Sequence, residues 1–165
     1  MVQNLPCLLK FVILMKRGCL LVSLSLLTLS VSLTSFAPAR DKNLVDDVFS
    51  YTNKFRRSKG LPALIINEDL NAIAQTHSVN MAKGRVGFGH GGFNKRYAMA
   101  KQKISNFSSF AENVAYGVNS GKEVVDLWKS SSGHRQNMLG KFRYIGIGTA
   151  KDRQGQIYYT QVFAN

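Results

Sequence analysis

Two histidines and one glutamate stand out because their side chains could share one chemical task. His90, Glu112 and His134 all lie in the second half of the chain. Two neutral imidazoles and a carboxylate can hold Zn²⁺ and leave one coordination position open for water. The same set could equally be a histidine pair whose orientation is fixed by the carboxylate.

The spacing of these residues does not assign a metal site by itself. Glu112 lies 22 positions after His90 and 22 positions before His134. This spacing matches no local motif, such as two histidines on one helical turn. Each residue also has a structural alternative: Glu112 could accept backbone amides beneath the glycine-rich run 87–92, and His134 could be a hydrogen-bonding loop residue.

Two helices are expected ahead of the first histidine. Residues 43–59 place apolar side chains near one stripe, and Gly60 follows as a stop signal. A second helix is expected to begin after Asn67, a good N-cap, and to end at Gly84. Its apolar positions recur at helical spacing and include His77, which we therefore expect to face the core with its hydrogen bonds satisfied.

The elements that carry His90 and Glu112 follow the second helix. The glycines around His90 exclude regular structure in residues 85–92, which are interpreted as a loop. A short helix is possible over residues 93–103. The run AENVAYG, residues 111–117, carries Glu112 and is interpreted as a strand or a strand-like turn.

The region around His134 is expected to be helical. Residues 120–123 have the form of a capping box, which opens a helix. Gly133 is expected to interrupt that helix, with residues 134–139 forming one further turn. Trp128 and Tyr116 are expected in the core. Serines 130–132 lack the strand–turn–helix context of a nucleophile elbow, which argues against serine catalysis.

The chain is expected to end in a β-hairpin. Residues 144–150 and 156–164 are rich in β-branched and aromatic side chains, and residues 151–155 carry the turn. Helices around a small, mainly antiparallel sheet predict an α+β domain with three layers, α-β-α.

The first 39 residues have the pattern of an export signal. Met15 opens a basic segment and is interpreted as the true start, an apolar run follows, and residues 37–39 fit a small-residue cleavage site before Arg40. The alternative is an uncleaved anchor, although the apolar run is shorter than the about 20 residues that a span needs. Cleavage would remove both cysteines, Cys7 and Cys19, and leave one domain, residues 40–165, outside the cell or in the periplasm or envelope.

The charge is strongly basic, with 22 Lys and Arg against 9 Asp and Glu and a formal net charge of +13. Small groups of cations, including Lys95-Arg96 and Arg56-Arg57, are scattered along the chain. One interpretation is a solvated surface. The other is attraction to an anionic partner in the envelope, such as a phosphate-rich polymer or lipid head groups. A protein partner is also open, whereas export and the lack of a recognition motif argue against nucleic acid.

Six segments follow one another over residues 45–163: RRSKGLPAL with a later HS..MA, then FGH, AENVAYG, W…GHR.NML, IGIGTA and YYTQVFA. In this order they resemble the CAP superfamily of cysteine-rich secretory, antigen 5 and pathogenesis-related 1 proteins. The chain looks most like the compact bacterial branch of that superfamily. The resemblance implies an α-β-α sandwich and a cleft that contains two histidines and two glutamates.

The resemblance places His90, Glu112 and His134 at three of the four cleft positions. At the fourth, where the family has its second glutamate, this chain has Ser131. The resemblance implies that His90 and His134 could hold a divalent metal such as Zn²⁺, with Glu112 as a ligand or an orienting neighbour. It favours a secreted binding module. The alternative is a metal-assisted hydrolase of peptide or ester bonds with Glu112 as general base, and Ser131 weighs against any mechanism that needs paired carboxylates.

Overall fold

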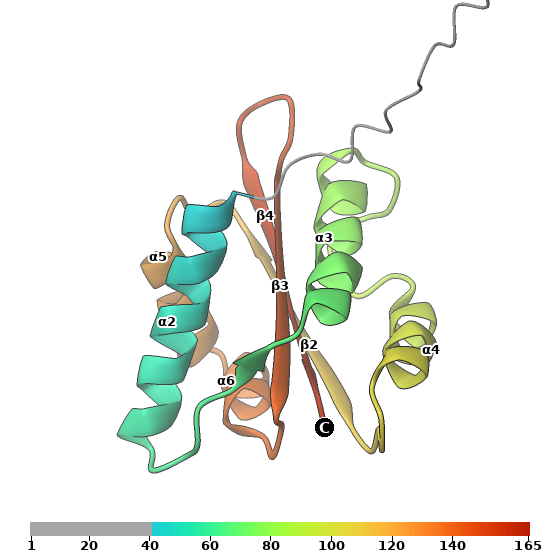
Figure 1. Ribbon diagram of the computed structural model, residues 1–165. Coiled ribbons are helices and arrows are strands. Elements are labelled where there is room, and N and C mark those ends of the chain that lie inside the picture. Colours follow the sequence, from blue (N-terminus) through green and yellow to red (C-terminus); the bar gives the residue numbers. More distant parts are fainter. Residues whose placement is uncertain (1–40) are drawn as a thin grey trace, which may run out of the picture. The chain divides into compact units, whose positions relative to one another are not determined.

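The computed structural model describes residues 41–165 of the chain, so the expected export signal lies outside the described residues. Helices and strands follow one another in a mixed order (Figure 1). They are α2 (Lys42–Ser58), β1 (Ile65–Ile66), α3 (Glu68–Ala82), α4 (Phe93–Lys103), β2 (Phe110–Tyr116), α5 (Gly121–Ser130), α6 (Ser132–Leu139), β3 (Tyr144–Lys151) and β4 (Ile157–Ala164).

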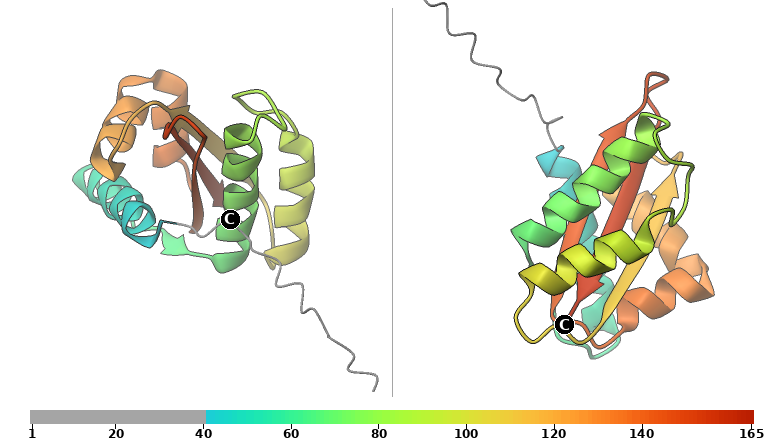
Figure 2. Two further views of the ribbon diagram at one scale, coloured as in Figure 1. Left: turned by 90° about the horizontal axis from the view of Figure 1, so that it is seen from above. Right: turned by 90° about the vertical axis from the view of Figure 1, so that its right-hand side faces the viewer.

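The strands form a four-stranded sheet in the order β1-β3-β4-β2. The short strand β1 runs parallel to β3, and the other neighbours are antiparallel. Helices α2, α5 and α6 cover one face of the sheet, and α3 and α4 cover the other (Figures 1 and 2). The predicted three-layer α-β-α sandwich with a mainly antiparallel sheet is confirmed.

Side-chain caps fix where the helices begin. Asp41 accepts the amide of Leu44 at the start of α2, and Asn67 accepts the amide of Leu70 at the start of α3. The predicted capping box of Ser120 and Glu123 is present at α5. Caps satisfy amides that a helix leaves without internal partners, and the sequence identified them because the cap residue types are few.

One local expectation was wrong. The helix that opens at Ser120 breaks at Ser131, whose backbone is extended, and Gly133 lies inside α6. Residues 65–66, for which the sequence predicts no element, form β1 because they pair with Tyr144 and Ile145. A two-residue strand has too few positions to show an alternating pattern, so its partner strand decides its structure.

The core lies on both faces of the sheet. One cluster, around Trp128, fills the side of α2 and α5, and a smaller one lies under α3 and α4. The run IGIG in β3 alternates between the two faces of the sheet. Ile145 and Ile147 pack in the larger cluster. Gly146 and Gly148 face α3, and a Cβ at either position would overlap the backbone of that helix. The glycines therefore allow α3 to lie directly on β3.

This close approach lets side chains of α3 bond to the backbone of β3 beyond the end of β1. Asn71 Oδ1 accepts the amide of Ile147 at 2.7 Å, and Gln75 Oε1 accepts the amide of Thr149 at 3.0 Å. The side-chain amide of Gln75 also donates to the carbonyl of Thr149. Within residues 41–165, no helix combines the length and the apolar character required to cross a bilayer.

Candidate functional site

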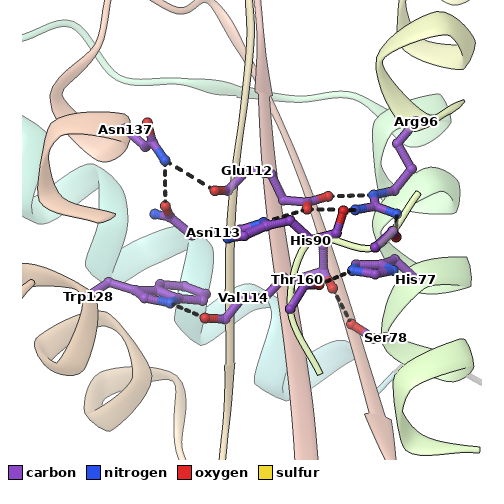
Figure 3. Close-up of polar contacts among 12 residues, drawn as sticks. His77, Ser78, His90, Arg96, Glu112, Asn113, Val114, Trp128, Asn137 and Thr160 are labelled. Atoms are coloured by element: carbon purple, nitrogen blue, oxygen red, sulfur yellow. Dashed lines mark hydrogen bonds and ion pairs between the residues drawn. The ribbon is translucent and has the colours of Figure 1, made fainter. Parts of the chain in front are cut away.

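Glu112 lies on β2 with its side chain fully buried, and it faces an arginine that comes from α4 (Figure 3). Arg96 Nε lies 2.5 Å from Glu112 Oε2, and Arg96 Nη2 lies 2.7 Å from Oε1. This is a two-pronged pair in which each carboxylate oxygen accepts an N–H, the arrangement for which a guanidinium is suited. Glu112 is therefore an ion-paired residue and not a free carboxylate.

Arg96 also fastens the glycine-rich loop that carries His90. Its Nη1 donates to the carbonyl of Gly91 at 2.8 Å. Gly92 has a left-handed backbone, with φ of 77°, and a Cβ there would approach Arg96 Nη1 to 3.3 Å. Glycine therefore suits this position for both its backbone and its lack of a side chain.

His90 completes the contacts of the carboxylate. Its Nδ1 lies 2.8 Å from Glu112 Oε1, while its side chain is 51% exposed. Because an ionised carboxylate can only accept, Nδ1 carries a proton and donates it to Glu112. The pair therefore orients one imidazole at the surface, with its other nitrogen, Nε2, on the side of the ring away from the carboxylate.

His77 is buried in α3, as predicted, and its Nε2–H donates to the carbonyl of Gly89 at 2.8 Å. It therefore holds the glycine-rich loop at Gly89, while Arg96 holds it at Gly91, and both side chains lie on the same side of His90 (Figure 3). Burial lowers the pKa of His77.

His134 lies on α6 and is half-buried, and no hydrogen bond joins its ring to Glu112 in the described residues. Its backbone carbonyl instead accepts the side-chain amide of Asn113 at 3.1 Å. Burial lowers the pKa of its imidazole, and the charge of His90 lowers it further. The structure thus brings His90 and Glu112 into contact and leaves His134 as a separate neighbour.

The three side chains do not form a three-donor metal site. Among residues 41–165, no group of three or more His, Cys, Asp or Glu is arranged to hold a metal ion. The two oxygens of Glu112 already accept hydrogen bonds from Arg96 and His90. The residues present fit at most a two-imidazole site in which Glu112 orients His90.

Side chains from α5 and α6 bond to the outer carbonyls of β2. Asn137 Nδ2 donates to the carbonyl of Glu112 at 3.1 Å and to Asn113 Oδ1 at 2.9 Å. The indole of Trp128, which is buried as predicted, donates to the carbonyl of Val114 at 3.2 Å. These bonds fix the strand that carries Glu112.

A groove of about 280 Å³ adjoins His134 along β2 and the end of α5. Three large apolar side chains in it are exposed: Phe88 by 52%, Leu127 by 46% and Tyr116 by 44%. The expectation that Tyr116 lies in the core was wrong, because its ring stacks on Tyr158 and meets the edge of Phe88 at the surface. The remaining lining residues are Val114, Ala115, Ser130, Ser131 and His134.

The family model for the cysteine-rich secretory protein family, CAP, matches residues 49–163. The chain belongs to the CAP family. A sequence relative is the uncharacterised protein YkwD of Bacillus subtilis strain 168, which is 33% identical over 118 residues. The match covers 70% of this chain and 46% of YkwD, so the CAP chain spans less than half the length of that relative.

Solved structures agree with the CAP fold. An extracellular protein containing an SCP domain from Bacillus anthracis is 28% identical with a TM-score of 0.63, over 75% of this chain and 40% of its own. An outer surface protein of Borrelia burgdorferi is 20% identical with a TM-score of 0.66, over 75% of this chain and 93% of its own, and shows the fold alone.

Two arginines of this CAP domain are buried, against expectation. The sequence predicts scattered surface cations that include Arg96 and Arg56, yet both side chains are buried. Arg56 donates to the carbonyls of Met138 and Gly140 at the end of α6. Arg96 lies four positions before Ala100, so both fall on the buried face of α4, and this spacing could have indicated that Arg96 is buried. The spacing is not enough by itself, because a charged side chain is almost never buried without a partner, and only the fold reveals the partner.

We expect the CAP domain to lose stability when the pH falls from 7.5 to 5.5. His77 and His134 have lowered pKa values in the folded state, chiefly because burial disfavours the charged imidazole. An unfolded histidine has an ordinary pKa of about 6.5, so near and below that pH the unfolded chain binds more protons than the folded domain. The free energy of unfolding therefore decreases as the pH falls through this range. Urea unfolding at both pH values checks this, and His77→Gln should reduce the difference. Equal midpoints in the parent protein at the two pH values would contradict it.

Proposed function

We propose that this CAP domain is exported and acts as a binding module rather than as a hydrolase. Its ligand lies in the groove beside His134. Support for export comes from a relative described as an extracellular protein, and from the expected signal in residues 1–39.

The observation that carries the proposal is the state of Glu112. A general base needs a carboxylate oxygen that can reach the proton it removes. Both oxygens of Glu112 are bonded within the buried pair with Arg96 and His90, so this residue serves to orient its neighbours. At the position of the family's second cleft glutamate this chain has Ser131, which lines the groove and cannot act as a carboxylate base.

The groove indicates what kind of ligand the site takes. Phe88, Tyr116 and Leu127 offer exposed apolar surface, and His134 adds a polar group at its edge. Ligand sites in proteins combine mostly apolar walls with a few placed polar groups. The ligand is therefore an amphiphilic molecule or side chain with an apolar part and at least one hydrogen-bonding group.

Binding is tested with Nile red, a neutral dye whose emission changes in apolar surroundings, on protein purified from cells that express the full chain. We expect Phe88→Ser/Leu127→Ser to weaken dye binding at least roughly fivefold, because two apolar contacts are lost. The matched control is Ile65→Ser/Met99→Ser, which changes two other exposed apolar side chains. Equal weakening in the two double variants would contradict the proposed groove.

A divalent metal is a separate test of the same site. We expect Zn²⁺ to bind weakly at His90 and His134, because two imidazoles without a third donor give a poor site. Elemental mass spectrometry on untagged protein should find zinc when it is offered in excess, little after desalting, and none in His90→Ala/His134→Ala. Stoichiometric zinc that survives desalting would contradict this expectation and make hydrolysis worth assaying with Glu112→Gln.

A further inference from the structure

We infer that this domain carries a second binding site at the C-terminal end of β3. Its ligand is an anionic polymer with repeated phosphate groups. A concave surface of about 790 Å³ lies there between the end of α3 and the turn that joins β3 to β4. Four exposed cations line it, and we call it the basic cleft: Lys83, Arg85, Lys151 and Arg153. It shares no lining residue with the groove beside His134.

The cations of the basic cleft lack the carboxylate partners that others have. Lys42, Lys103, Lys122 and Lys129 each form an ion pair with an aspartate. In residues 41–165 no such pair is found for the four cleft cations. The one carboxylate in the lining, Asp152, is occupied by the turn, where its Oδ1 accepts the amides of Gln154 and Gln156, each at 2.9 Å.

The ends of the elements do not explain all of these charges. Cations near the C-terminus of a helix interact favourably with the helix dipole, which accounts for Lys83 and Arg85 after α3. Lys151 and Arg153 come from the hairpin, at the same end of the sheet (Figures 1 and 2). They have no helix terminus of their own to neutralise, and they add positive charge to a place that already holds two cations. Clefts lined by one sign of charge concentrate ligands of the opposite sign.

The shape and the lining favour a polymer chain over a membrane or a nucleic acid. The cations stand on two walls of a concave surface, which suits a chain that passes between them. A bilayer-binding surface would need exposed apolar side chains as anchors, and the one apolar residue in the lining is Ala82. Single-stranded nucleic acids are held by aromatic platforms, and the lining contains no aromatic ring.

The test measures binding of medium-chain inorganic polyphosphate to protein purified from cells that express the full chain. At about 50 mM salt we expect the parent to bind and Lys151→Gln/Arg153→Gln to bind roughly tenfold more weakly. The slope of log affinity against log salt should fall by about 0.7 per lost contact. The matched control is Arg57→Gln/Lys141→Gln, which removes one Lys and one Arg at the other end of the sheet and should change affinity by less than about threefold.

A second pair of substitutions keeps the test independent of the hairpin. Lys83→Gln/Arg85→Gln on the other wall should weaken binding to a similar extent, and circular dichroism should show all variants folded. If the Arg57→Gln/Lys141→Gln control lost as much affinity for polyphosphate as the cleft variants, the proposal would be overturned. Polyphosphate would then respond to the net charge of the protein and not to the basic cleft. Absence of polyphosphate binding, with or without binding to phosphatidylglycerol vesicles or single-stranded DNA, would overturn it as well. Neither result depends on ligand binding beside His134.

Discussion

Replacing Arg96 with methionine is expected to destabilise the domain by about 3–5 kcal/mol, because it leaves the carboxylate of Glu112 buried without its partner. The side chain of Glu112 is fully inaccessible, and Arg96 supplies two of its N–H donors. The substitution also removes the bond that Arg96 makes to the carbonyl of Gly91. Urea unfolding followed by circular dichroism measures the loss. Since domains of this size have only about 5–15 kcal/mol in total, the variant is expected to be close to unfolding at room temperature.

The control for this prediction is the double variant Arg96→Met/Glu112→Gln. Removing both charges avoids an unpaired buried ion, so we expect the double variant to be more stable than Arg96→Met alone. His90→Ala, which removes the more exposed partner of Glu112, should cost less than Arg96→Met. A loss below about 1 kcal/mol in Arg96→Met, or a double variant that is less stable than both single variants, would show that the pair does not hold the site together.

The second large effect is expected from Gly146→Ala and Gly148→Ala. The new methyl group would overlap the backbone of α3 at Leu70 in one case and at Ala74 and Gln75 in the other. Overpacked positions typically cost about 1–3 kcal/mol, and a clash with backbone cannot be relieved by a change of side-chain rotamer, so we expect about 3 kcal/mol or more. Thermal unfolding measures the effect.

The matched control is Gly133→Ala, because Gly133 lies inside α6 and a Cβ there would meet no atom within 4 Å. Alanine is the better helix former by about 1 kcal/mol, so this variant is expected to be as stable as the parent or slightly more stable. If Gly148→Ala were as stable as Gly133→Ala, α3 would not lie as close to the sheet as described.

The sequence predicted the helices well because their signals are local. The caps at Asn67 and Ser120 and the spacing around His77 each depend on a few neighbouring residues, and all three are confirmed. The strand β1 could not be predicted, because its two residues are strand only through their pairing with Tyr144 and Ile145 on β3. The spacing of residues along the chain specifies the long helices, whereas contact with β3 specifies the short strand β1.

The candidate site was predicted in part. The resemblance identified His90 and Glu112 as neighbours, and the structure brings them into contact. It could not show that Arg96 neutralises Glu112, because the two residues are 16 positions apart and come from different elements. The structure shows Glu112 as a buried group bonded to Arg96 and His90, and its role as a general base stays a prediction. The exposure of Tyr116 was missed for a similar reason, since its neighbours Phe88 and Tyr158 come from other segments.

The bonds that α3, α5 and α6 make to the sheet have a consequence for how copies of this protein behave at high concentration. An edge strand with free amides and carbonyls is a template on which a strand of another molecule can add, the first step of amyloid-like association. Here Asn137 and Trp128 bond to carbonyls along β2, while Asn71 and Gln75 bond to β3 where β1 ends. In a domain without a disulfide in residues 41–165, helix side chains thus occupy backbone groups of the edge strand β2 and of β3 beyond β1. Loss of one of these side chains would raise the tendency of the folded protein to aggregate as well as lower its stability.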